Sequence, residues 1–220
     1  MSWKFIFLKF LNMKTIHELM EWRFACKHFV ADKNIPEDQL RDILDSARLA
    51  PSSFGLQAWK FIVVTNKELL QKLAEPAYGQ SQVKEAAALV VFCARNDFLG
   101  EEGVIKKHVD NLQKLSGKTD EEMVKSHQNF VDMIEAKGVE GSLAWAQRQV
   151  YIPVETLIIA AAEKEIDSAP MEGFDPIGVA KVLELPENLH PTVLVALGYR
   201  NMEAPKKART ALETVVEFRN

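Results

Sequence analysis

Two basic segments near opposite ends of the chain carry the residues best suited to binding an anion. Arg23 and Lys27 are four residues apart, so a helical turn would place both cations on one side. The second segment holds Lys206, Lys207 and Arg209, and its arginine could contact a phosphate through two parallel hydrogen bonds. Taken singly, each segment is more typical of a solvated basic edge than of a binding site.

Two polar connections between apolar stretches form a second set of candidates. Residues 50–57 read Ala-Pro-Ser-Ser-Phe-Gly-Leu-Gln, a tight connection whose hydroxyls and amides are free to form hydrogen bonds. Residues 167–176 are expected to link a long helix to the next one. In this link Glu172 and Gly173 would present backbone amides, and Asp175 could cap the following helix. Each segment is also compatible with an ordinary loop.

Residue spacing disfavours several other kinds of reactive site. The five histidines occur at no spacing typical of a helical metal site, so no metal is predicted. No serine lies in a G-x-S-x-G turn. Cys26 could be a thiolate nucleophile beside Arg23 and Lys27, but a lone cysteine is more often a small packed hydrophobe, which we favour. The ten glycines are scattered, which excludes a glycine-rich phosphate loop.

Composition narrows the class of protein. A chain of 220 residues is long enough for one domain with a sizeable core. The net charge of −4 disfavours a nucleic-acid binder. The longest apolar run, residues 86–94, is far shorter than the roughly 20 residues needed to span a bilayer, so no membrane association is expected. Two cysteines cannot build a disulfide scaffold, and a cytoplasmic location is the default expectation.

The hydrophobic pattern predicts few strands and many helices. Buried strands are expected where valine, isoleucine and phenylalanine cluster, at residues 59–65, 88–94 and 192–199. Helices are expected at residues 15–22, from 36 onward, and at 67–73, 143–165 and 176–183, with a kink or a restart at Pro153. Residues 101–137 are polar and helical and should be the most exposed part. Without regular strand-helix alternation, an α+β fold is favoured over a doubly wound sheet.

The two ends of the chain have patterns of their own. The apolar stretch near the N-terminus is interrupted by Lys9, and no small-residue cleavage site follows it. We therefore interpret residues 1–12 as an extension and residues 13–220 as the domain. Apolar alternation over residues 214–218 predicts that the tail pairs with a sheet edge, of this chain or of a partner.

Taken together, the four polar and basic segments resemble the FMN-dependent nitroreductase family, from about Thr15 to the end of the chain. The resemblance depends on the order of four motifs: Arg-x-x-x-Lys-x-Phe, Ala-Pro-Ser-Ser-x-x-x-Gln-x-Trp-x-Phe, Pro-Met-Glu-Gly-Phe-Asp, and Lys-x-Arg. Each motif alone is weak, whereas four in order with hydrophobic strands between them are quite specific. The chain departs from the family pattern at Ala25, Ala58 and Gly79, where the family commonly has serine, proline and asparagine.

The resemblance implies a cationic cofactor site built from both ends of the chain. Arg23, Lys207 and Arg209 would bind the FMN phosphate. Lys27 would lie at the pyrimidine edge of the flavin, where a cation stabilises negative charge on the reduced ring. The neighbouring positions in the same motifs are also implied as cofactor contacts: Phe24, Ala25, Pro170 and Met171.

The resemblance also implies which residues face the flavin ring. Glu172 and Gly173 would lie on one side, with a backbone amide near the flavin N5, and Glu172 and Lys27 are the implied catalytic residues. Gln80 and Gln82 would make polar contacts at the ring edge. The segment implied to pack on the flavin from a second subunit consists of Pro51, Ser52 and Ser53.

The fold implied by the resemblance is a three-layer α-β-α sandwich with a mainly antiparallel central sheet and a domain-swapped C-terminal segment. The implied protein is a homodimer with two flavins at its interface. It would transfer a hydride from NAD(P)H through FMN to a small nitroaromatic or quinone-type acceptor, in a ping-pong exchange. Three alternatives remain: a dehalogenase-like or oxidase-like flavoenzyme of the same fold, a flavin-binding module without turnover, and a structural or partner-binding helical protein.

Overall fold

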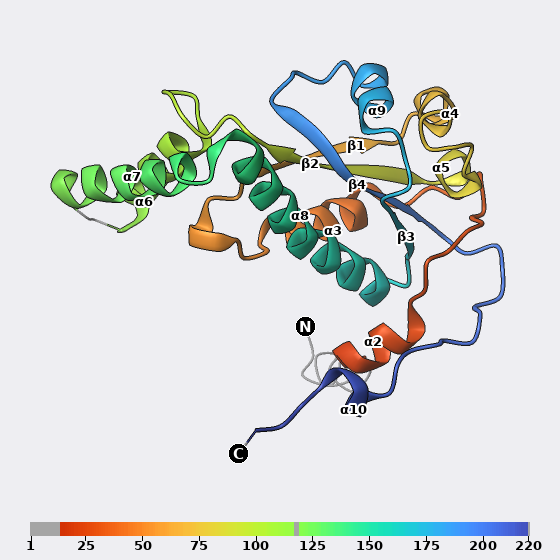
Figure 1. Cartoon of the computed structure of the whole chain (residues 1–220). Helices are drawn as coiled ribbons and strands as arrows, with labels where there is room; N and C mark the ends of the chain where they lie inside the picture. Colours follow the sequence, from red (N-terminus) through yellow and green to blue (C-terminus); the bar gives the residue numbers. More distant parts are fainter. Residues whose placement is uncertain (1–13, 117–118, 220) are drawn as a thin grey trace, which may run out of the picture.

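A four-stranded antiparallel sheet lies at the centre of the residues that the structure, a computed structural model, describes, namely 14–116 and 119–219 (Figure 1). Its strands are β1 (Trp59–Val64), β2 (Ala88–Arg95), β3 (Asp167–Met171) and β4 (Leu189–Gly198). They occur in the order β1-β2-β4-β3, and each neighbouring pair is antiparallel. The predicted α+β class is confirmed. The predicted boundary between residues 12 and 13 lies outside the described residues.

Helices cover both faces of the sheet, which gives the three layers that the family resemblance implied. Alternate residues of β2 enter two separate cores, with Val90 in one and Val91 in the other. The first core is closed by α3 (Glu37–Arg48) and α8 (Gly138–Glu163). The second core is closed by three shorter helices: α4 (Lys67–Ala74), α5 (Ser81–Glu85) and α9 (Pro176–Val182).

Two helix starts follow the local signals in the sequence. Helix α2 (Ile16–Trp22) begins after Thr15, whose side chain accepts a hydrogen bond from the Glu18 N–H, while the Glu18 carboxylate accepts one from the Thr15 N–H. Helix α3 begins after Pro36, and Ile43 and Ala47 of its apolar stripe are buried in the first core. Both of these helices were predicted.

Two details of the prediction are wrong, and a third is not found within one chain. Helix α8 begins at Gly138 rather than Leu143 and continues through Pro153 without a restart. Residues 167–171, predicted to be part of a loop, form strand β3 and pair with β4. The predicted pairing of residues 214–218 with a sheet edge is not found within the described part of this chain, where the short helix α10 (Leu212–Val215) begins just before them; pairing with a partner's sheet stays a prediction.

Helices α6 (Val104–Ser116) and α7 (Asp120–Glu135) project from one end of the sandwich as an arm (Figure 1). Their contact buries Val109 and Met123, whereas Leu115 and Val124 are exposed. The prediction of exposed helices over residues 101–137 is thus largely confirmed. Helix α2 and the C-terminal tail lie well away from this arm (Figure 1).

Candidate functional site

The first part of the site begins where α2 ends. The Arg23 N–H donates to the Leu19 carbonyl at 2.9 Å, and the backbone of Arg23 is already extended. The chain then runs beside β3, where the Cys26 N–H donates to the Ser168 carbonyl at 3.1 Å. Arg23 and Lys27 therefore do not share a helical turn, and that part of the prediction is wrong.

The C-terminal tail returns to this point and contributes a second cation. The Lys207 ammonium donates to the carbonyl oxygen of Arg23 at 2.6 Å and also to that of Met20. These are carbonyls at the C-terminal end of α2, where a positive charge is favourable. The two ends of the chain thus meet, as the cofactor site implied by the resemblance requires.

The positive charges of Arg23, Lys207 and Arg209 interact with one another at this point, and nearby carboxylates do not fully balance them. Burial lowers the pKa of the Arg23 guanidinium; the charge of Glu155 opposes this shift and that of Arg209 adds to it. Burial and the charges of Arg23 and Arg209 also lower the pKa of Lys207, against the charge of Glu21. The Nε and Nη2 atoms of Arg23 are buried and have no hydrogen-bond partner among the described residues. An anion with several acceptor oxygens fits such a group of donors.

The second part of the site is a turn that follows β3. Glu172 and Gly173 are exposed, and the Gly173 carbonyl accepts a hydrogen bond from Gln80 Nε2 at 2.8 Å. The Gln82 side chain is 3% exposed and donates to Gln80 Oε1 at 2.7 Å and to Met171 Sδ at 3.2 Å. The structure therefore brings Gln80 and Gln82 to the predicted turn, and their contacts to a cofactor ring remain a prediction.

Lys27 lies between these two parts. The Ser81 hydroxyl donates to the Lys27 carbonyl at 3.0 Å, which fixes the backbone of Lys27 beside the start of α5. The Lys27 side chain is exposed, and no described residue forms a hydrogen bond or ion pair with its ammonium. Ala25 forms an isolated parallel bridge with Ser168, so residues 23–27 and β3 line the same region.

Phe24 lies in an enclosed part of the site. The Phe24 ring is 9% exposed and lies 4.8 Å from the guanidinium carbon of Arg200. Arg200 in turn pairs with the buried carboxylate of Asp167 at 2.6 Å. Pro170 is half-buried and Met171 is buried in β3. Arg200 and Asp167 were not predicted as site residues, because a single Arg and a single Asp carry no spacing signal.

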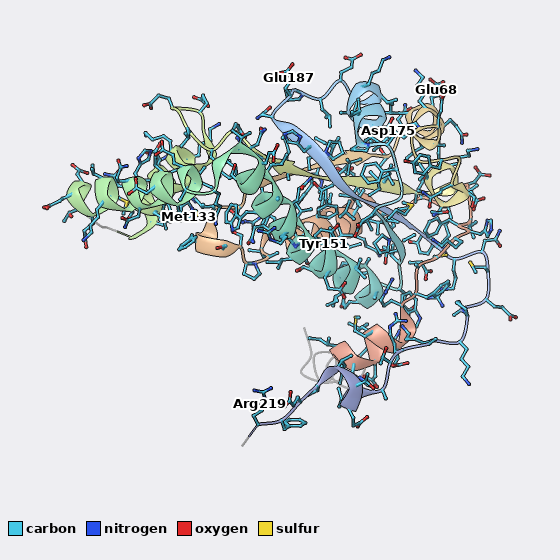
Figure 2. All side chains as sticks on the ribbon, viewed as in Figure 1. Glu68, Met133, Tyr151, Asp175, Glu187 and Arg219 are labelled. Atoms are coloured by element: carbon cyan, nitrogen blue, oxygen red, sulfur yellow. The ribbon has the colours of Figure 1, made fainter. Side chains whose placement is uncertain are left out.

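Tyr151 is a second residue that sequence reasoning missed. It projects from α8, the long helix below the sheet (Figure 2), and its phenol lies close enough to the Glu172 carboxylate for the two groups to interact electrostatically. Burial raises the pKa of Tyr151 to about 12, and the negative charge of Glu172 acts in the same direction. The phenol therefore stays protonated near Glu172. One tyrosine in a long apolar helix gives no signal of this role.

The Pro51–Ser53 segment lies elsewhere. The Ser53 N–H donates to Gln149 Oε1 at 2.8 Å, and the following Phe54 ring lies 5.7 Å from that of Phe130 in the arm. Figure 1 shows this segment near the arm, far from α2 and the C-terminal tail. A single chain therefore does not bring Pro51, Ser52 and Ser53 to the cations.

A histidine of the arm supports the same segment. The His108 ring lies 5.5 Å from the Phe130 ring, and its Nε2 is buried with no partner among the described residues. Gly55 has a φ of 71°, and a Cβ there would approach His108 Cε1 to 3.1 Å. Glycine is thus needed at position 55 for both its backbone conformation and its small size. Burial lowers the pKa of His108, although its contact with the Phe54 backbone opposes the shift.

Other chemistry finds little support in the described residues. Among residues 14–116 and 119–219, no group of three or more His, Cys, Asp or Glu side chains could hold a metal ion. Both cysteines are buried and free, and burial raises the pKa of Cys26 and that of Cys93, the latter to about 12. Cys26 is therefore a packed thiol rather than a thiolate. No helix in this part of the chain has the length and apolar character to cross a membrane.

Comparisons with known proteins agree with the fold and the motifs. A sequence model described as "Nitroreductase family" matches residues 20–199. A Staphylococcus haemolyticus protein with an NAD(P)H nitroreductase name is 32% identical over 93% of this chain and 97% of its own length. A crystal structure of the nitroreductase YdfN from Bacillus subtilis covers 97% of this chain and 100% of its own, at 22% identity and a TM-score of 0.83. Another, from Exiguobacterium sibiricum and in complex with FMN, covers 94% and 98%, at 18% identity and a TM-score of 0.82.

Proposed function

Because the chain belongs to the nitroreductase family, we propose that it is an NAD(P)H-dependent oxidoreductase that uses FMN as its cofactor. The observation that carries this proposal is the group of Arg23, Lys207 and Arg209, which meets from both ends of the chain. The FMN complex of a protein with the same fold supports the choice of cofactor.

The residues fit the two ends of FMN. A phosphate dianion would supply acceptors for the buried Nε and Nη2 of Arg23, which have no partner among the residues that the structure describes, and would offset the repulsion between Lys207 and Arg209. At the other end, the exposed ammonium of Lys27 suits a ring edge that gains negative charge. No glycine-rich loop is needed for this arrangement, which agrees with the scattered glycines.

The bound FMN would supply the redox chemistry, accepting a hydride at N5 from NAD(P)H and passing it to a second substrate. The protein supplies charge and position. Lys27 stabilises negative charge by its proximity, and the Glu172–Gly173 turn offers backbone N–H donors. The neutral Tyr151 phenol near the Glu172 carboxylate is a polar group that can orient this side chain.

The second substrate is proposed to be a small nitroaromatic or quinone-type acceptor, reduced in a ping-pong exchange after NAD(P) has left. This choice depends on the family relationship. Dehalogenase-like or oxidase-like chemistry on the same fold is tested by a panel of acceptors, and a cytoplasmic location remains a prediction.

We further propose that the working unit is a homodimer in which residues 51–53 of one copy pack on the cofactor bound by the other. The distance of this segment from Arg23 in one chain supports this arrangement (Figure 1). The C-terminal tail also exposes Leu212, Val215 and Phe218, apolar side chains that a second copy would cover. Light scattering coupled to gel filtration should give the mass of a dimer, and a monomer would contradict this assembly.

The absorption spectrum of the purified protein tests the main proposal. We expect a flavin spectrum, FMN released on heating, and bleaching by NADH or NADPH without oxygen. Colourless protein that does not take up added FMN would overturn the proposal. Protein that binds FMN but oxidises no NAD(P)H with any acceptor would instead favour a flavin-binding module without turnover.

A further inference from the structure

The turn after β3 is held by the segment that precedes α5 and by the first residues of α5 itself. The Asp175 N–H donates to the Pro76 carbonyl at 2.7 Å, and Gln80 Nε2 donates to the Gly173 carbonyl at 2.8 Å. Gln82 Nε2 reaches the sulfur of Met171 at 3.2 Å. Residues 76–82 therefore contact the beginning, the middle and the end of the turn.

Both ends of the Gln80 amide are engaged within the chain. Its Nε2 also donates to the Ala77 carbonyl at 3.0 Å, and its Oε1 accepts from Gln82 at 2.7 Å. Gln82 is almost fully buried, so its amide depends on these partners. The two glutamines therefore act as a clasp on the turn and have little freedom to reorient.

The backbone before Gln80 is shaped to deliver its side chain. Tyr78 and Gly79 have φ values of 56° and 74°, two consecutive left-handed residues. The Gly79 N–H donates to the Ala74 carbonyl at 2.8 Å and closes the end of α4. No heavy atom lies within 4 Å of the Cβ position of Gly79, so glycine is required there for its conformation and not for space.

The hydrogen bonds of the turn fix the direction of one backbone donor. The Phe174 N–H donates to the Glu172 carbonyl at 2.9 Å, so this carbonyl points back into the turn. In a trans peptide the C=O and the following N–H point in opposite directions, so the Gly173 N–H points away. Neither the Glu172 N–H nor the Gly173 N–H has a hydrogen-bond partner among the described residues.

We propose that Gln80, supported by Gln82, is a positioning residue that holds the Gly173 carbonyl and thereby directs the Gly173 N–H toward the flavin. The Gly173 C=O and the Phe174 N–H belong to the same peptide, and this N–H donates to the Glu172 carbonyl. By holding the Gly173 carbonyl, the clasp therefore sets the plane of this peptide and, through the hydrogen bond, the plane of the peptide between Glu172 and Gly173. The inference depends on the proposed FMN function. It gives Gln80 and Gln82 a role through the turn in place of direct contact with the ring.

The test uses Gln80→Met, which keeps the length of the side chain and removes its hydrogen bonds. Gln71→Met on the exposed face of α4 is the matched control. The main readout is hydrogen–deuterium exchange of the peptide containing residues 172–174, with and without FMN. In the wild type, FMN should slow deuterium uptake there, and in Gln80→Met this protection should be lost while FMN is still bound within about 2-fold of wild-type affinity.

A second readout is the rate of hydride transfer from NADH to bound FMN in single turnover. We expect it to fall at least about 10-fold in Gln80→Met with the KM for NADH little changed, because a small misplacement of a positioning group has effects of this size. If Gln80→Met does not fold, Gln82→Met tests the same clasp. If a folded, FMN-loaded Gln80→Met or Gln82→Met variant shows the same protection from exchange and the same hydride-transfer rate as the wild type, this inference is overturned while the proposed function stands. Wild-type protein that binds no FMN would overturn the proposed function as well.

Discussion

The ammonium nitrogen of Lys207 lies 2.6 Å from the backbone carbonyl oxygen of Arg23, a residue 184 positions earlier in the chain. The same ammonium also binds the carbonyl of Met20, so the tail cation completes the C-terminal end of α2. Because Arg23 and Arg209 repel Lys207, this closure leaves the region in need of an anion. The fold of the two chain ends and the binding of a phosphate group are therefore expected to depend on each other.

Replacement of Arg209 by alanine should weaken FMN binding without unfolding the protein, because Arg209 is exposed and its only described hydrogen bond is to the neighbouring Ala208 carbonyl. A hydrogen bond to a charged group contributes about 1.5–3 kcal/mol, equivalent to an increase of roughly 10- to 150-fold in Kd. Titration of FMN-free protein, followed by quenching of flavin fluorescence, measures the change. Lys206→Ala, one residue before Lys207, is the matched control and should leave the affinity unchanged. Equal affinity of Arg209→Ala and wild type would remove Arg209 from the phosphate site.

Inorganic phosphate should stabilise the FMN-free protein. A bound anion relieves the repulsion that lowers the pKa of Lys207 and supplies acceptors to Arg23. For a chain of this size, each 1 kcal/mol gained on binding raises Tm by about 2–4 °C. Thermal unfolding in phosphate is compared with unfolding in chloride at equal ionic strength. Arg23→Met should abolish the difference between the two salts, and a variant that keeps the full phosphate effect would contradict the assignment.

The sequence predicted those elements whose hydrophobic pattern or capping residues match the burial and hydrogen bonds found in the structure. β2 is buried on both faces and reads as a continuous apolar run, and the capping box at Thr15 marks the start of α2. β3 was missed because Pro170 is unusual in strands; it is tolerated here because β3 lies at the edge of the sheet. The start of α8 was missed because glycines at its beginning are poor helix formers.

The candidate site also contains residues that the sequence predicted and residues that it did not. Arg23, Lys207 and Arg209 form recognisable basic motifs, and the structure brings them together. Tyr151 and the Gln80 clasp each approach the turn through individual side chains, and a single residue has no spacing that a sequence pattern could reveal. Their roles follow only from the tertiary contacts of α8 and of the segment before α5.

Tyr151→Phe should destabilise the protein in a way that depends on pH. Burial and Glu172 raise the pKa of Tyr151 from its ordinary 10.0 to about 12, so the folded state holds the phenolic proton more tightly than the unfolded state. The resulting stability is fully present below about pH 10 and is lost as pH rises toward 12. Urea unfolding at several pH values measures the gap between wild type and variant. The gap should be constant from neutral pH to about 9 and narrow above 10, and a gap that remains constant beyond 10 would contradict the raised pKa of Tyr151.

His108 should make the stability of the protein fall on mild acidification. Burial lowers its pKa below the ordinary 6.5, so the unfolded chain binds this proton more readily than the folded one. As pH falls below 6.5, protonation therefore favours unfolding, until both states are protonated at a pH below the lowered pKa. His190, whose pKa burial also lowers, should act in the same direction.

Urea midpoints between pH 7.5 and 5 should fall less steeply in His108→Gln than in wild type, and least steeply when His190→Gln is added. Because His108 packs on Gly55 and Phe130, the acid-sensitive change should also increase proteolysis of the arm in wild type. A His108→Gln variant with the wild-type pH dependence would show that this imidazole does not bind a proton on unfolding in that range.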